Sequence, residues 1–235
     1  MLIFGLDTCC MPATAALCDG EKLTAEFVIN CGRTHSQMIM PQIENMFKTL
    51  GVSCSDIDCF AVSCGPGSFT GVRIGVATLK AMAHAADKPC AAVSNLEALA
   101  HNVPYFDGII CPILDARRGQ VYSAMFKGSV CGIERLTEDK AVKLSELLAE
   151  LKEKNLNVLF LGDGIFVHRE YIKEELGSAA HFAPPNLNMN MAGSVAYLGA
   201  KAFERGDIIG YAELTPVYVR LSQAERERLE KENHK

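Results

Sequence analysis

The sequence predicts an α/β protein built as two lobes, and three observations support this. Short apolar segments alternate with amphipathic ones, as strands and helices around a shared core do. The chain opens with three strands before its first helix, whereas alternating βαβ proteins begin with strand and then helix. The segment NVPYFDG, near residues 102–108, is the best break in the middle of the chain. We therefore expect a first lobe over 1–105, a second over 106–210, and a C-terminal helix within 211–235 that returns to the first lobe.

The first half of the chain justifies this expectation element by element. Its three opening strands are LIFGLDT, ATAALCD and LTAEFVI. A helix over 34–50 follows and ends at Gly51, and Pro41 within it should bend it or delay its start. The strand IDCFAVSC then leads through GPGSFTG into a second helix over 70–86.

The second half repeats the pattern in looser form. It is expected to begin with a strand PCAAVS, a helix over 95–101, strands IICPILD and QVYSAMF, and a strand and helix around 144–152. A strand NVLFLGDG and an irregular stretch at Pro184-Pro185 follow, and then a helix over 191–205 that ends at Gly206. The last expected element is a charged helix from Ser222, where Ser222 and Glu225 form a capping box.

Composition limits the classes of function. Among the 235 residues there is no apolar run of about 18 residues, so we expect no membrane span and a cytoplasmic protein. The ten cysteines form no C-x-x-C, and most lie in apolar strands, so we expect reduced thiols instead of zinc sites or disulfides. The net charge of −5, with no basic stripe, argues against an autonomous grip on nucleic acid.

Three stretches carry a resemblance to a known family: FGLDT with the strand ATAAL, RTHSQMIMPQIENMF, and GPGSFTGVRIGVATLKAMA at residues 65–83. LDARRGQVY and TPVYVRLSQAE match as well. By these the chain resembles the TsaB (YeaZ) family, the non-catalytic dimerization subunits of the machinery that installs threonylcarbamoyladenosine beside the anticodon of tRNA. The resemblance implies an actin-like, sugar-kinase-like (ASKHA) fold with a mixed sheet in each lobe. It also implies a TsaD-like catalytic partner, a TsaE-like ATPase, tRNA contact only through the complex, and homodimers when the subunit is alone.

The helix over 70–86 is apolar nearly all round, which is typical of a helix buried on both sides. Val72, Val76, Leu79 and Ala83 should face its own sheet. Its other side is either covered by another part of this chain or bound by a partner helix, and the resemblance favours the partner. The residues expected at this interface are Met38, Gly71, Ile74, Gly75, Ala77, Thr78, Ala81 and Ala85.

A weak nucleotide or anion site is expected where the first hairpin meets GPGSFTG. Its candidate residues are Asp7, Thr8, Thr14, Gly65, Gly67 and Ser68. The hairpin turn has Pro12 and no glycine, so its backbone is poorly suited to approach phosphate. Self-sufficient ATP hydrolysis is therefore not expected, and binding of an adenine nucleotide shared with a partner remains open. For Ser68 the simpler interpretation is a helix N-cap.

No metal site is expected. The resemblance implies that the catalytic TsaD subunit carries a His-x-Glu-x-His motif on a helix, and the aligned segment here has Asn95, Glu97 and Leu99. Neither H-E-x-x-H nor G-x-S-x-G occurs. Two alternatives stay open, a stand-alone ATPase or kinase of the same fold and a metallopeptidase. Whether Asp115, Arg117 and Arg118 are structural or touch a partner also stays open.

Overall fold

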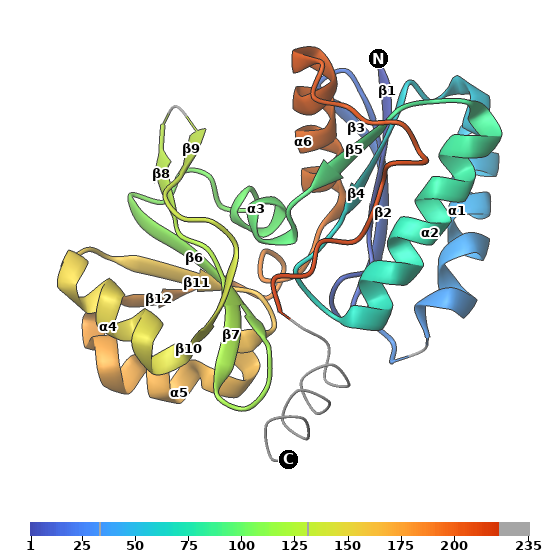
Figure 1. The fold of residues 1–235 in the computed structure, drawn as a ribbon. Helices are drawn as coiled ribbons and strands as arrows, with labels where there is room; N and C mark the ends of the chain where they lie inside the picture. Colours follow the sequence, from blue (N-terminus) through green and yellow to red (C-terminus); the bar gives the residue numbers. More distant parts are fainter. Residues whose placement is uncertain (33, 131, 221–235) are drawn as a thin grey trace.

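The first lobe is built on a mixed five-stranded sheet, in a computed structural model that describes residues 1–32, 34–130 and 132–220 (Figure 1). The strand order is β3-β2-β1-β4-β5. The strands are β1 (Leu2–Asp7), β2 (Ala13–Asp19), β3 (Lys22–Ile29), β4 (Cys59–Ser63) and β5 (Cys90–Val93). The first three are antiparallel neighbours, and β1, β4 and β5 run parallel. The opening hairpin expected from the sequence is confirmed.

One face of this sheet is covered by α1 (His35–Leu50) and α2 (Phe69–Ala86), which lie side by side (Figure 1). Strand alternation directs Phe4 and Leu6 of β1 towards these helices, where they join one apolar core with Ile43 and Leu79. A short 3₁₀ turn, η1 (Cys54–Asp56), follows α1. Although Pro41 lies inside α1, the helix begins at His35, so the proline does not delay its start.

The second lobe has a seven-stranded sheet whose main path is β10-β7-β6-β11-β12, with β8 pairing β6 and β9. The strands are β6 (Gly108–Asp115), β7 (Gln120–Ser123), β8 (Phe126–Ser129), β9 (Gly132–Arg135), β10 (Lys140–Lys143), β11 (Val158–Leu161) and β12 (Ala180–Phe182). Helices α4 (Leu144–Lys154) and α5 (Gly164–Leu176), followed by η2 (Gly177–Ala179), pack on one face. The sequence interpretation missed α5, which follows the glycine turn after β11.

Each lobe packs against one helix that is adjacent in sequence to the strands of the other lobe. Helix α3 (Asn95–Ala100) follows the first sheet, yet Leu96 and Leu99 pack in one apolar cluster with Ile110 and Phe126 of the second lobe. Helix α6 (Ala192–Arg205) follows the second sheet and packs on β1 and β4 of the first (Figure 1). The boundaries expected from the sequence, a first lobe over 1–105 and a second over 106–210, therefore assign α6 to the wrong lobe. The order of elements along the chain does not show that α6 returns to the first sheet.

After α6 the chain runs along the first lobe. Ile209 pairs with Cys90 at the edge of β5, and Leu214 is buried in the core beneath α2. The C-terminal helix expected from Ser222 lies outside the described residues.

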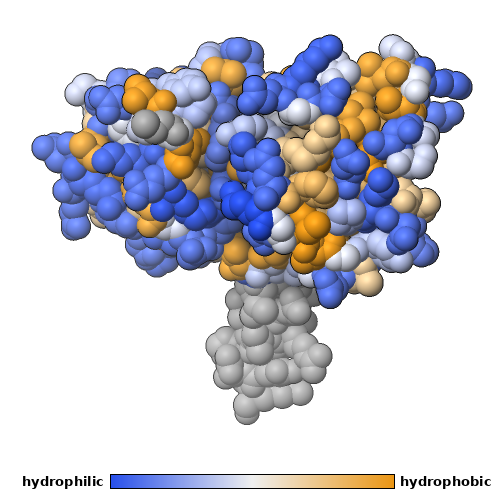
Figure 2. Space-filling view, turned by 90° about the horizontal axis from the view of Figure 1, so that it is seen from above, coloured by the Kyte–Doolittle hydropathy of each residue, from blue (hydrophilic) through white to orange (hydrophobic). Residues whose placement is uncertain are grey.

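The cysteines that the structure describes are free thiols, and seven of those nine are buried. Burial raises the pKa of the thiols of Cys59 and Cys111 to about 12 in each case, which keeps them protonated and unreactive. Within the described part of the chain, no helix is both long and apolar enough to cross a bilayer. Seen from above, hydrophobic residues gather over the first lobe, on the right, while the second lobe is mostly hydrophilic (Figure 2).

Candidate partner interface and interlobe cleft

Helix α2 presents a stripe of small and apolar side chains to solvent. Ala77, Ala81 and Ala85 are exposed, and Ile74 and Thr78 are half-buried. They fall on one side because residues three, four and seven apart share a helix face. On neighbouring α1, Met38 is half-buried. The structure thus leaves six of the eight predicted interface residues on the surface of the first lobe.

The other two, Gly71 and Gly75, are buried, so their assignment to a partner interface is wrong. Both lie under the end of β1, where the Thr8 hydroxyl donates to the Gly71 carbonyl over 2.7 Å. A Cβ on Gly71 would overlap the Thr8 carbonyl oxygen, and a Cβ on Gly75 would lie 2.5 Å from Thr8 Oγ1. Glycine is required here for close helix–strand packing within the lobe.

Gly71→Ala is therefore expected to destabilise the fold, by about 1–3 kcal/mol through overpacking, although alanine is the better helix former by about 1 kcal/mol. Gly193→Ala in α6 is the matched control, because its Cβ would make only an ordinary contact, 3.4 Å from Glu26. We expect Gly193→Ala to leave the fold as stable as wild type or more so. Urea unfolding of both variants checks this, and equal stability of the two would contradict the packing argument.

Residues 212–218, which follow α6 and run along the first lobe, cover one edge of α2. Tyr218 stacks on Phe69 with ring centroids 4.3 Å apart and accepts a hydrogen bond from Arg73 Nε over 2.8 Å. Lys80 Nζ donates to the carbonyls of Ala212 and Leu214. The chain therefore seals the edge that carries Phe69, Arg73 and Lys80 and leaves the alanine stripe open.

The hairpin residues predicted for nucleotide are all engaged inside the protein. The Asp7 carboxylate is fully buried and accepts hydrogen bonds from Cys9 N, Ser63 Oγ and Asn190 Nδ2. Thr14 Oγ1 accepts from Ala192 N at the start of α6, and Thr8 donates to α2. Asp7, Thr8 and Thr14 are thus wrongly assigned to a ligand site, because each satisfies a buried polar group of this chain.

Burial also raises the pKa of Asp7, and the hydrogen bonds from Ser63, Asn190 and Cys9 oppose that rise by stabilising the carboxylate. Asp7 is consequently a structural acid that links β1, β4 and the segment before α6.

The predicted GPGSFTG loop borders a cleft of about 790 Å³ between the lobes. Gly67 and Ser68 line it, with Phe69 and Thr70. Ser68 is the N-cap of α2 and accepts from Gly71 N, which confirms the simpler interpretation of this residue. Gly65 is buried against the Val217 carbonyl and does not reach the cleft.

The opposite wall belongs to the second lobe, and the sequence interpretation left it unassigned. It includes Asp115, Arg117, Tyr122 and Asp163. Asp163 Oδ1 accepts the Asp115 backbone N–H over 3.0 Å, and Asp115 Oδ1 accepts that of Arg117. Asp163 lies two residues after the end of β11, and polar groups at the carboxyl ends of parallel strands often line a crevice. The LGDG pattern was therefore an available signal. Asp115 and Arg117 thus take part in backbone hydrogen bonds and also line the cleft, whereas Arg118 is exposed.

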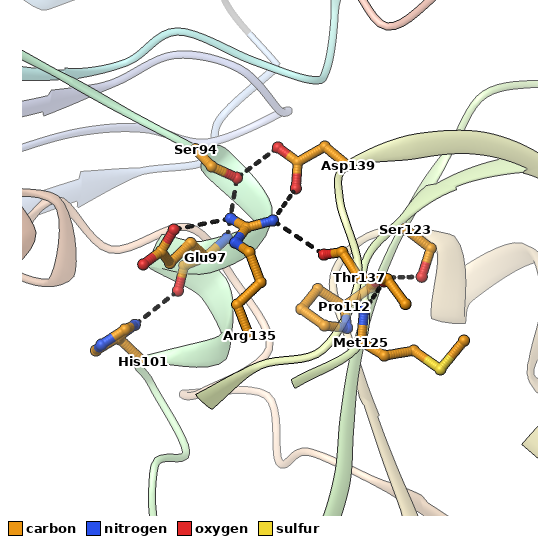
Figure 3. Close-up of polar contacts among 9 residues, drawn as sticks. All are labelled: Ser94, Glu97, His101, Pro112, Ser123, Met125, Arg135, Thr137 and Asp139. Carbon is orange, nitrogen blue, oxygen red and sulfur yellow. Dashed lines mark hydrogen bonds and ion pairs between the residues drawn. The ribbon is translucent and has the colours of Figure 1, made fainter. Parts of the chain in front are cut away.

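Helix α3 carries Asn95, Glu97 and Leu99, the three residues that the resemblance aligns with a His-x-Glu-x-His motif. Asn95 is buried in amide hydrogen bonds, and Leu99 lies in the apolar cluster that faces the second sheet. Glu97 pairs with Arg135 Nη2 over 2.7 Å, and Arg135 Nη1 binds Asp139 over 2.7 Å (Figure 3). In the described residues, no three His, Cys, Asp or Glu side chains converge as a metal site would require.

The chain is similar in sequence to known proteins over nearly its whole length. Residues 29–226 match the family described as TsaD, tRNA N6-adenosine threonylcarbamoyltransferase. The tRNA threonylcarbamoyladenosine biosynthesis protein TsaB of Bacillus subtilis is 36% identical over 98% of this chain and 99% of its own. That of Escherichia coli is 29% identical over 94% and 95%. A tRNA N6-adenosine threonylcarbamoyltransferase of Sphingopyxis alaskensis is 35% identical, but over only 42% of this chain and 33% of its own.

Solved structures give the same fold. A Pseudomonas aeruginosa protein described as similar to the peptidase YEAZ superposes with a TM-score of 0.78 at 22% identity, over 93% of this chain and 99% of that one. Component A of the Acidaminococcus fermentans (R)-2-hydroxyglutaryl-CoA dehydratase superposes with a TM-score of 0.50 at 11% identity, covering 86% and 98%. The molecule is a two-lobed protein of the actin-like (ASKHA) fold. Asp7, the acidic residue at the end of its first strand, is buried in the core. Within that class, the chain belongs to the TsaB (YeaZ) family.

Proposed function

We propose that the protein takes part in the biosynthesis of tRNA threonylcarbamoyladenosine as the non-catalytic subunit that binds a TsaD-like transferase. The exposed faces of α1 and α2 form the contact, and the transferase moves the threonylcarbamoyl group from its adenylate to the adenosine beside the anticodon. The main support for this proposal is that Ala77, Ala81 and Ala85 are exposed to solvent. The neighbouring edge of α2, with Phe69 and Lys80, is covered by this chain itself. Small side chains let a second helix approach closely, and an interface core is poor in charge.

Three further features support a partner role. The relatives named as transferases are similar to this chain over a limited region, so a partner of that kind would share part of its architecture. The net charge of −5 suits a subunit that meets tRNA only through the complex. Asn95 and Leu99 are poor metal ligands, so the catalytic metal would belong to the partner.

A TsaE-like ATPase would complete the assembly in the cytoplasm. In the absence of the transferase, the exposed faces of α1 and α2 would pair two copies of the subunit.

An adenine nucleotide shared with a partner would lie in the cleft beside Gly67, Ser68 and Thr70, since the hairpin residues are engaged elsewhere. Arg117 on the facing wall would supply positive charge. Calorimetric titration of ADP into the subunit alone and into the complex separates these two states, and tighter binding by the complex is expected.

The direct test is to co-purify the subunit with the TsaD-like protein of the same organism and to assay threonylcarbamoyl transfer to tRNA. We expect transfer by the pair and none by this subunit alone. Magnesium-dependent ATP turnover by the isolated chain would favour the stand-alone ATPase or kinase. Stoichiometric zinc or iron in elemental analysis would favour the metallopeptidase.

A further inference from the structure

One of the connections between the lobes contains residues 186–191, which we call the asparagine crossing. It carries the chain from β12 in the second lobe to α6 on the first. Its sequence places asparagine at every second position. Asn188 and Asn190 are 4% and 3% exposed, whereas Asn186 is exposed. Two buried amides in a connecting segment call for a specific set of partners, because a buried polar group without a partner is destabilising.

Asn188 binds the second lobe. Its Oδ1 accepts the backbone N–H of Gly162, immediately after β11, over 2.7 Å. The backbone carbonyl of Asn188 lies 3.3 Å from the same nitrogen.

Asn190 binds the first lobe and α3 together. Its Nδ2 donates to Asp7 Oδ2 at the end of β1 over 2.8 Å, and to the side-chain oxygen of Asn95 at the start of α3. Asn95 donates in turn from Nδ2 to the Pro66 carbonyl and from its backbone N–H to the Gly65 carbonyl, each over 2.9 Å. The network thus reaches from β1 through the crossing and α3 to the loop before α2.

Asn188 and Asn190 line a pocket of about 230 Å³, and this pocket shares Cys10 and Asp163 with the interlobe cleft. Pro66, whose carbonyl accepts from Asn95, also lines the cleft. We propose that the asparagine crossing is a pin that fixes the two lobes at one separation, so that the cleft keeps a single width and does not open and close as a hinge. Separating the lobes would break the Asn188, Asn190 and Asn95 bonds together, in a site that excludes the water needed to replace them. A second hydrogen bond joins two residues that line the cleft, since Arg220 Nη1 donates to the Ala116 carbonyl. This inference is independent of the proposed partner.

Native-state hydrogen exchange on the full-length chain tests the pin without a mutation. The amides of Gly162 and Cys9 lie in different lobes and bond to Asn188 and to Asp7, respectively. If the crossing is a pin, both amides open in one event, with the same free energy and the same denaturant dependence. Independent opening of the two amides, with either one poorly protected, would overturn the proposal.

Variants of the crossing provide the second measurement, with the exposed Asn186 as matched control. Asn190→Ala and Asn188→Ala are each expected to speed exchange about tenfold or more in the segments bonded to the crossing or next to those bonds, residues 7–11, 65–70 and 162–165. Strands β4 and β6 should keep their protection. Asn186→Ala should change nothing. Equal acceleration throughout both lobes would reveal a merely stabilising role, and no acceleration at the cleft would show that the pin does not exist.

Discussion

Arginine in place of both Ala77 and Ala81 is expected to weaken binding of the TsaD-like partner by roughly 30-fold to several thousand-fold. An unpaired charge forced into a buried contact costs about 2–5 kcal/mol, and each 1.4 kcal/mol is about tenfold in affinity. Both alanines are exposed in the isolated subunit, so the longer side chains have solvent to occupy before binding. The affinity of the purified pair, measured by calorimetry or interferometry, gives the result directly.

The control is Ala149→Arg, an exposed alanine on α4 in the second lobe, far in sequence from the proposed contact. All variants should unfold at urea concentrations close to wild type, because single surface changes alter the free energy of unfolding by no more than about 0.5 kcal/mol. If Ala77→Arg with Ala81→Arg bound as tightly as wild type, the interface would have to lie elsewhere. Equal weakening by Ala149→Arg would show that added charge, and not its place, is the cause.

The structure also predicts where an interface variant would mislead. Gly71 and Gly75 lie on the same helix and were part of the sequence-based interface, but they pack under Thr8. Loss of binding in a glycine variant would therefore report damage to the lobe and not to the contact surface.

Much of the fold is predictable from the sequence because local patterns specify it. The three opening strands, α1, α2 and α6 are predicted within one or two residues, since apolar periodicity and the stop signals at Gly51 and Gly206 fix their ends. The exchange of α3 and α6 between lobes is not predictable in this way. A helix with one apolar face specifies that it is buried, and the choice of sheet depends on packing between residues distant in the chain.

The candidate site divides along the same line. Which helical residues are apolar and small is visible in the sequence, and the stripe on α2 follows from it. Whether a glycine faces a partner or the protein's own strand requires coordinates, and so does the engagement of Asp7 by Asn190, 183 positions away. An acid at the end of the first strand has the same appearance in a nucleotide site and in a buried network.

Removing the Asp7 carboxylate is expected to have the second large effect, on stability. Asp7→Ala leaves Cys9 N, Ser63 Oγ and Asn190 Nδ2 without their acceptor, in a site with no solvent exposure. Because each buried unsatisfied donor costs about 1–3 kcal/mol and partial relaxation recovers some of the loss, we expect a decrease of about 2–4 kcal/mol in the free energy of unfolding at pH 7. Asp107→Ala, at an exposed position before β6, should change it little.

The pH dependence identifies the cause, because the pKa of Asp7 is raised in the folded protein by burial. The folded state then holds this proton more tightly than the unfolded state does. The contribution of Asp7 to the free energy of unfolding is therefore greatest below its unfolded pKa, near 3.8, and falls as pH rises through the higher folded pKa. The amide side chain introduced by Asp7→Asn does not titrate, so the free energy of unfolding of wild type minus that of the variant should fall as pH increases from about 4 and then level off. Urea unfolding from pH 4 to 8 measures this difference. A constant difference would show that the Asp7 carboxyl titrates alike in the folded and unfolded states. Lost hydrogen bonds alone would then account for the lower free energy of unfolding of Asp7→Ala.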